Sequence, residues 1–145
     1  MIVVERRIER PCEAVFQVLA DGWVYSGWVV GASTIRHVDA HWPQPGAQIH
    51  HAVGIWPLVV EDISRAVSAE PPHRLVLQAF AWPFGEARIV LELHPLEDGA
   101  CLVRMSEDVS TGTGRLLPYP LRRLVLQPRN RECLRRLDLL SGRYS

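Results

Sequence analysis

A long amphipathic segment near the C-terminus constrains the fold of this 145-residue chain more than any other feature. Residues 119–142 read YPLRRLVLQPRNRECLRRLDLLSG. Pro118 and Pro120 suit a helix start, where a backbone N–H has no helical partner. Gly142 follows the last apolar residue and predicts a left-handed C-cap. A helix of this length needs a large apolar surface to lie against.

Pro128 divides this predicted helix into two halves. An interior proline removes a backbone hydrogen bond and costs roughly 3 kcal/mol. At about 100° per residue, the apolar residues before and after it point in nearly opposite directions. We therefore expect a terminal helix that is kinked or broken near Pro128 and whose halves bury different sides. The two apolar sets are Leu121, Leu124 and Val125, then Cys133, Leu134, Leu137 and Leu140.

The rest of the chain predicts strands joined by short turns, with two short helices after the first strand. The order favours an α+β fold, in which an antiparallel meander of seven strands curves around the terminal helix. We expect residues 1–145 to form a single domain. The predicted strands are residues 2–9, 33–39, 48–55, 58–69, 74–81, 86–93 and 100–109, and the short helices are residues 12–19 and 23–27.

Glu107 is an acid within an apolar row of the last predicted strand. It alternates with Met105 and Val109, which puts it on the face that should meet the helix. One interpretation is structural, with an arginine or backbone N–H groups as partners. The other is a pocket acid whose pKa is raised by burial.

One predicted hairpin can bring two or three histidines together. His51 lies on the more apolar face of its strand, and the turn through Pro43 and Gly46 places His37 opposite His50 or His51. Such a group suggests a metal, but no ligand pair has the usual spacing. We expect a buried core histidine and no metal. The cysteines are also too scattered for a zinc site and suggest buried thiols.

Charge is balanced overall but unevenly placed. Residues 115–145 hold eight arginines against Glu132 and Asp138, a net charge of +6, and the chain has no lysine. A basic helix suits an anionic partner, yet the arginines lie off the apolar stripes, so we expect a solvated face. No segment approaches the roughly 20 apolar residues of a membrane span. The N-terminus lacks a signal-like apolar run, so we expect a cytoplasmic protein.

An ordered set of motifs resembles a known family. The motifs are the opening strand followed by RPCEAVFQVLAD, WVVG at residues 28–31, WPQPG followed by two histidines and Gly54, RLVLQ from Arg74, Glu107, and RNRECLRRL in the terminal helix. Together they resemble the SRPBCC superfamily, which includes START lipid-transfer domains, pathogenesis-related allergens and bacterial polyketide cyclase/dehydrase-type proteins. The resemblance covers about residues 3–140.

This resemblance implies a helix-grip fold with a cavity between the long helix and the sheet. The function that it favours is binding of a small hydrophobic molecule, lipid-like or polyketide-like, without a cofactor. The alternative is a metal-free cyclase or dehydratase in which Glu107 or His51 transfers a proton. A weaker alternative is an interaction protein that uses its basic helix.

We expect no nucleic-acid partner and a monomer or a homodimer. The TGTG loop at residues 111–114 is a candidate gate for the cavity. The residues expected to line it are Tyr25, Trp28, His51, Trp56, Met105, Glu107 and Leu137.

Overall fold

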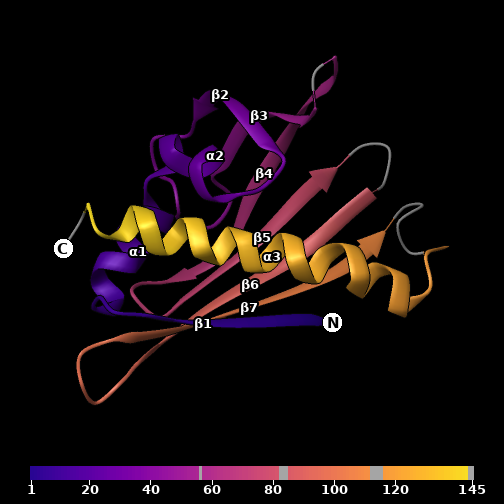
Figure 1. Cartoon of the computed structure of the whole chain (residues 1–145). Helices are drawn as coiled ribbons and strands as arrows, with labels where there is room; N and C mark the ends of the chain where they lie inside the picture. Colours follow the sequence, from indigo (N-terminus) through magenta and orange to yellow (C-terminus); the bar gives the residue numbers. More distant parts are fainter. Residues whose placement is uncertain (56, 82–84, 112–115, 144–145) are drawn as a thin grey trace.

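The computed structural model describes residues 1–55, 57–81, 85–111 and 116–143. In this part of the chain, seven strands form one antiparallel sheet, and a long helix lies across one of its faces (Figure 1). The elements are β1 (Ile2–Ile8), α1 (Cys12–Ala20), the 3-10 helix η1 (Gly22–Val24), α2 (Tyr25–Trp28), β2 (Ala32–Val38), β3 (Gln48–Ile55), β4 (Leu58–Glu70), β5 (Arg74–Ala81), β6 (Gly85–Pro95), β7 (Cys101–Thr111) and α3 (Tyr119–Ser141). Each predicted strand is confirmed, with ends that differ by at most two residues.

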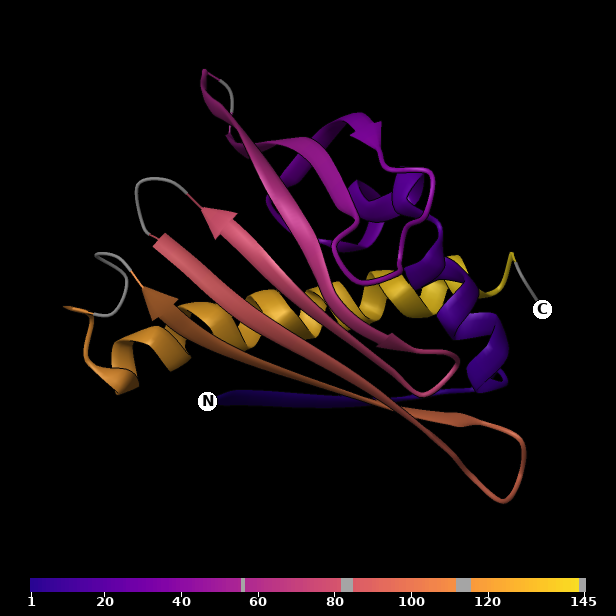
Figure 2. The same cartoon turned by 180° about the vertical axis from the view of Figure 1, so that it is seen from behind.

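The sheet order is β1-β7-β6-β5-β4-β3-β2. Strands β2 to β7 follow one another as hairpins, whereas β1 pairs with β7, with Ile2 opposite Glu107. The segment containing α1 and α2 carries the chain from one edge of the sheet to the other (Figure 2). Helix α3 packs against β1, α1 and α2. The helix-grip prediction is therefore confirmed.

The core lies between the second half of α3 and the inner face of the sheet. Because side chains alternate along a strand, β6 and β7 each present one apolar row to the helix. Six residues from these two rows and from α3 belong to one core and are all at most 3% exposed: Ile89, Leu91, Val103, Met105, Leu134 and Leu137. The three cysteines are buried free thiols, as expected.

Helix α3 differs from the prediction in three respects. It is continuous through Pro128, so the predicted break is wrong. The proline is on the exposed side of the helix, where water can replace the missing backbone hydrogen bond. Gly142 ends the helix with a φ of −62°, in the right-handed region, so the predicted left-handed cap is also wrong.

The third difference concerns the first half of α3, which does not bury its apolar face. Leu121, Leu124 and Val125 are 49%, 71% and 64% exposed. This half extends toward the start of β6 and the end of β7 (Figure 1). An apolar face is buried only where another element covers it, and in the described part of the chain nothing covers this one.

We predict that Leu137→Ala lowers the free energy of unfolding by about 2–5 kcal/mol, because the fully buried side chain leaves a cavity in the core. Leu124→Ala is the matched control on the exposed half of the same helix. Its effect should stay below about 0.5 kcal/mol. Urea unfolding monitored by circular dichroism measures both. A loss below about 1 kcal/mol for Leu137→Ala would contradict the packing described here.

Candidate functional site

A cavity of about 400 Å³ lies between the first half of α3 and the sheet. Its walls come from α2 and the turn after it, from strands β2 to β7, and from α3 with the residue Leu117 before it. Small side chains, such as those of Ala79 and Ala87, lie on the strands beneath this half of the helix and leave the space open. Beneath the second half of α3 the corresponding space is filled by the core. The apolar lining consists of Val29, Val30, Ala32, Val53, Ala79, Phe80, Ala87, Ile89, Val109, Leu117, Val125 and Leu126.

Three polar side chains form a hydrogen-bonded chain at the inner wall. The hydroxyl groups of Tyr25 and Ser64 are 2.7 Å apart, and His51 Nε2 is 2.9 Å from Ser64 Oγ. All three residues line the cavity and are buried. They come from α2, β3 and β4, which tertiary packing brings together.

A backbone carbonyl group determines which side chain donates and which accepts in these hydrogen bonds. His51 Nδ1 lies 3.4 Å from the carbonyl oxygen of Ala52, which can only accept a hydrogen bond. A neutral imidazole that donates from Nδ1 accepts at Nε2, so Ser64 donates to His51 and Tyr25 donates to Ser64. The lone pairs of the Tyr25 oxygen remain as acceptors at the cavity wall.

Aromatic packing holds Tyr25 in place behind the cavity. Its ring meets Trp28 edge to face at 5.5 Å and Trp42 at 6.4 Å between centroids. Trp42 is in turn anchored, because its indole N–H donates to the carbonyl oxygen of Leu19 at 3.1 Å. Rings that pack in this way have little freedom to rotate, so the hydroxyl of Tyr25 is preorganised.

Burial keeps the side chains of His51 and Tyr25 uncharged near pH 7. Loss of hydration lowers the pKa of His51, because burial disfavours the imidazolium form. The same effect raises the pKa of Tyr25 to about 12. His51 is therefore an acceptor and Tyr25 a protonated donor under ordinary conditions.

A second polar cluster joins α3 to the sheet beside the cavity. Glu107, which is 5% exposed, accepts hydrogen bonds from Asn130 Nδ2 at 2.9 Å and from Arg129 Nη1 at 3.3 Å. Arg129 Nε also donates to the carbonyl oxygen of Val30 at 3.1 Å. The arginine partner agrees with the structural interpretation of Glu107. The residue also borders the cavity, so the two interpretations are not exclusive.

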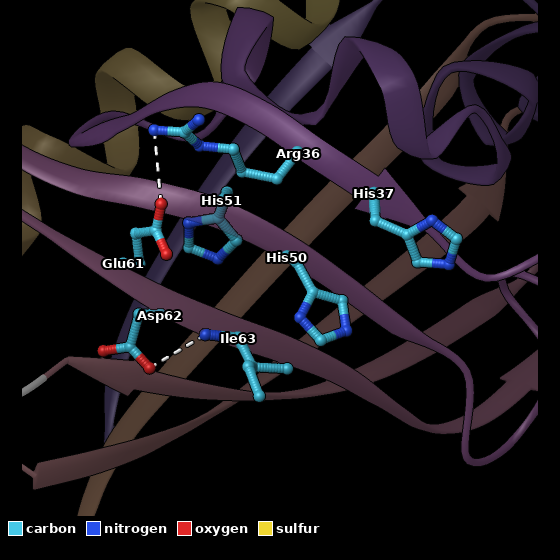
Figure 3. A pocket seen from close by; sticks show the side chains of 7 residues that line it. All are labelled: Arg36, His37, His50, His51, Glu61, Asp62 and Ile63. Carbon is cyan, nitrogen blue, oxygen red and sulfur yellow. Dashed lines mark hydrogen bonds and ion pairs between the residues drawn. The ribbon is translucent and has the colours of Figure 1, made fainter.

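A separate hollow of about 380 Å³ lies on strands β2 to β4 (Figure 3). Arg36 and Glu61 form an ion pair of 3.2 Å at one end, and the rings of His37 and His50 are 5.7 Å apart at the other. His37 is opposite His50 in the strand register, as the hairpin predicts. Within the described residues, no group of three or more histidine, cysteine, aspartate or glutamate side chains is arranged to hold a metal.

The structure places the sequence-predicted site residues in three settings. Tyr25, His51 and Glu107 line the cavity. Trp28, Met105 and Leu137 belong to the packed core, and each is at most 2% exposed. Trp56 and residues 112–114 of the TGTG loop lie outside the described residues.

Sequence reasoning missed the other polar residues of the cavity, which are Ser64, Glu86, Arg122 and Arg129. The arginines were expected on a solvated face, but Arg122, Leu126 and Arg129 line the cavity together. Their i, i+4, i+7 spacing marks one helix face and was a usable signal. Ser64 had no comparable signal, since its role depends on the pairing of β3 with β4.

We predict that His51 makes the protein sensitive to mild acid. The unfolded chain binds a proton near the usual pKa of 6.5, whereas the folded protein binds it only at lower pH. Stability should therefore fall as the pH drops below 6.5 toward the lowered pKa, and this loss should be smaller in His51→Gln. Thermal unfolding between pH 7.5 and pH 5 measures it. His94→Gln, at an exposed position, should keep the wild-type acid sensitivity.

We also predict that Glu107→Gln lowers the free energy of unfolding by about 1–3 kcal/mol, because a half-buried Arg129 loses its charged partner. The control is Glu61→Gln, which breaks an exposed ion pair with Arg36 and should cost less than about 1 kcal/mol. Denaturant unfolding compares the two. Equal small effects would show that the Glu107 ion pair adds nothing to stability.

Comparison with known proteins finds the same architecture in solved structures. A START-superfamily protein from Mycobacterium smegmatis matches with a TM-score of 0.76 and 14% identity, over 99% of this chain and 95% of that one. A protein from Nitrosomonas europaea matches with a TM-score of 0.74 and 16% identity, over 98% and 94%. One from Rhodobacter sphaeroides matches with a TM-score of 0.72 and 21% identity, over 99% and 94%.

No protein-family model and no curated protein matches the sequence. The described residues contain no helix long and apolar enough to cross a membrane. At these identities the structural matches establish the fold. Sheet order, helix position and structural neighbours together show that the chain has the helix-grip fold of START-superfamily proteins.

Proposed function

We propose that this protein binds a small hydrophobic molecule in the cavity between α3 and the sheet. The observation that supports it most directly is the cavity, whose volume of about 400 Å³ falls within the usual range for ligand pockets. Its walls are mainly aliphatic, with a few polar groups. This combination favours an apolar ligand that is oriented by one or two hydrogen bonds.

The polar groups are arranged as ligand-orienting groups should be. The hydroxyl of Tyr25 is held by Ser64 and by its aromatic neighbours, so binding a ligand donor there costs little ordering. The charges of Glu107 and Arg129 neutralise each other, and this ion pair forms a fixed part of the cavity wall. A fixed wall with the Tyr25 oxygen as an acceptor suits recognition of a lipid-like or polyketide-like molecule.

A second candidate is an enzyme of the cyclase or dehydratase type. The observation in its favour is the chain from Tyr25 through Ser64 to His51, because a neutral His51 that accepts through Ser64 can take up a proton. Glu107 suits this role less, since Arg129 and Asn130 already occupy one of its oxygens. A ligand recovered from the protein in altered form would favour catalysis, and one recovered unchanged would favour binding.

The binding proposal is tested with N-phenyl-1-naphthylamine, an uncharged apolar dye that fluoresces when it leaves water. The wild-type protein should bind it at one saturable site. Ala87→Phe should weaken binding by about tenfold or more, because the larger ring occupies the cavity. Ala40→Phe is the control at an exposed position and should bind like the wild type.

Thermal unfolding of both variants shows whether each is folded. Absence of dye binding by the wild-type protein would refute the proposal. So would a folded Ala87→Phe variant that binds as tightly as the wild type.

A further inference from the structure

Arg122 lines the cavity from the exposed half of α3. It stands seven residues before Arg129 on the same helix face, which corresponds to two turns and a rise of roughly 10 Å. Arg129 reaches the polar cluster at the inner end, whereas Arg122 is beside the exposed Val125 and Leu121. Arg122 is therefore at the mouth of the cavity.

One nitrogen of the Arg122 guanidinium is left without a partner by the described residues. Its Nε is buried, and in the described part of the chain it has no hydrogen-bond partner. Other arginines contrast with it, since Arg129 pairs with Glu107 and Arg135 with Glu132. A buried donor without a partner is costly, and native proteins seldom retain one without a use.

The acids of the cavity wall are engaged elsewhere. Glu107 is paired with Arg129. Glu86 accepts a hydrogen bond from Gln78 at 3.0 Å, and both residues also line another hollow, on the side of the sheet that carries Arg65 and Arg88. The mouth of the cavity therefore presents a cation beside an apolar chamber.

We propose, on the basis of the binding function above, that the ligand is an amphipathic acid whose carboxylate is bound by Arg122. A guanidinium binds a carboxylate through two parallel N–H donors, and Nε supplies one of them. Among the described residues Arg122 takes part in no ion pair, and a single guanidinium matches a monoanion better than a phosphate dianion. The apolar part of the acid extends along the aliphatic walls toward Tyr25.

The test displaces N-phenyl-1-naphthylamine with two competitors of equal chain length, decanoate and decan-1-ol, at pH 7.5. The wild-type protein should bind decanoate about tenfold more tightly than the alcohol. Arg122→Gln should lose this preference and keep its affinity for decan-1-ol. Arg123→Gln, at the adjacent exposed position, should keep the preference.

Three results would overturn the proposal. In the first, the wild-type protein binds both competitors equally, which leaves the binding function intact and removes its acid specificity. In the second, the preference survives in Arg122→Gln, which places the carboxylate elsewhere. In the third, the wild-type protein does not bind the dye, and the binding function fails together with the inference. Retained dye binding by Arg122→Gln shows that this variant is folded.

Discussion

The buried contact of Glu107 with Arg129 and Asn130 separates a close-packed part of this molecule from a part that contains a cavity. On one side of it, Leu134 and Leu137 press α3 onto the sheet in a close-packed core. On the other side, the same helix spans a cavity. A carboxylate at this depth is stable only with charged and hydrogen-bonding partners, and both come from α3. The contact therefore fixes the height of the helix above the sheet.

The division of α3 also explains why the cavity stays open. An element that is anchored at its second half can extend over open space at its first half, as a continuous helix does here. Two of the residues on the strands below that half, Ala79 and Ala87, are small and leave space between the sheet and the helix. Arg122 and the exposed apolar residues near it then lie at the rim, where a ligand with an acidic end and an apolar body has complementary groups to meet.

Much of the architecture was predictable, because it depends on local patterns. Alternation on β7 identified its buried row, which includes Met105, and turn residues marked the strand ends. The position of Glu107 in that row was also evident, since a period of two places a side chain on a known face. His37 met His50 because hairpin geometry leaves few choices of register.

The sequence by itself determined the order of strands and helices, the buried face of the last strand and the position of Glu107 on that face. Tertiary structure alone decided which half of α3 would be covered, and the helical period could not show this because both halves carry an apolar face. It also decided that Tyr25, Ser64 and His51 meet, since they lie on separate elements whose contact depends on the crossing of the whole sheet. Local patterns report which side of an element is apolar. What lies against that side is a property of the assembled fold.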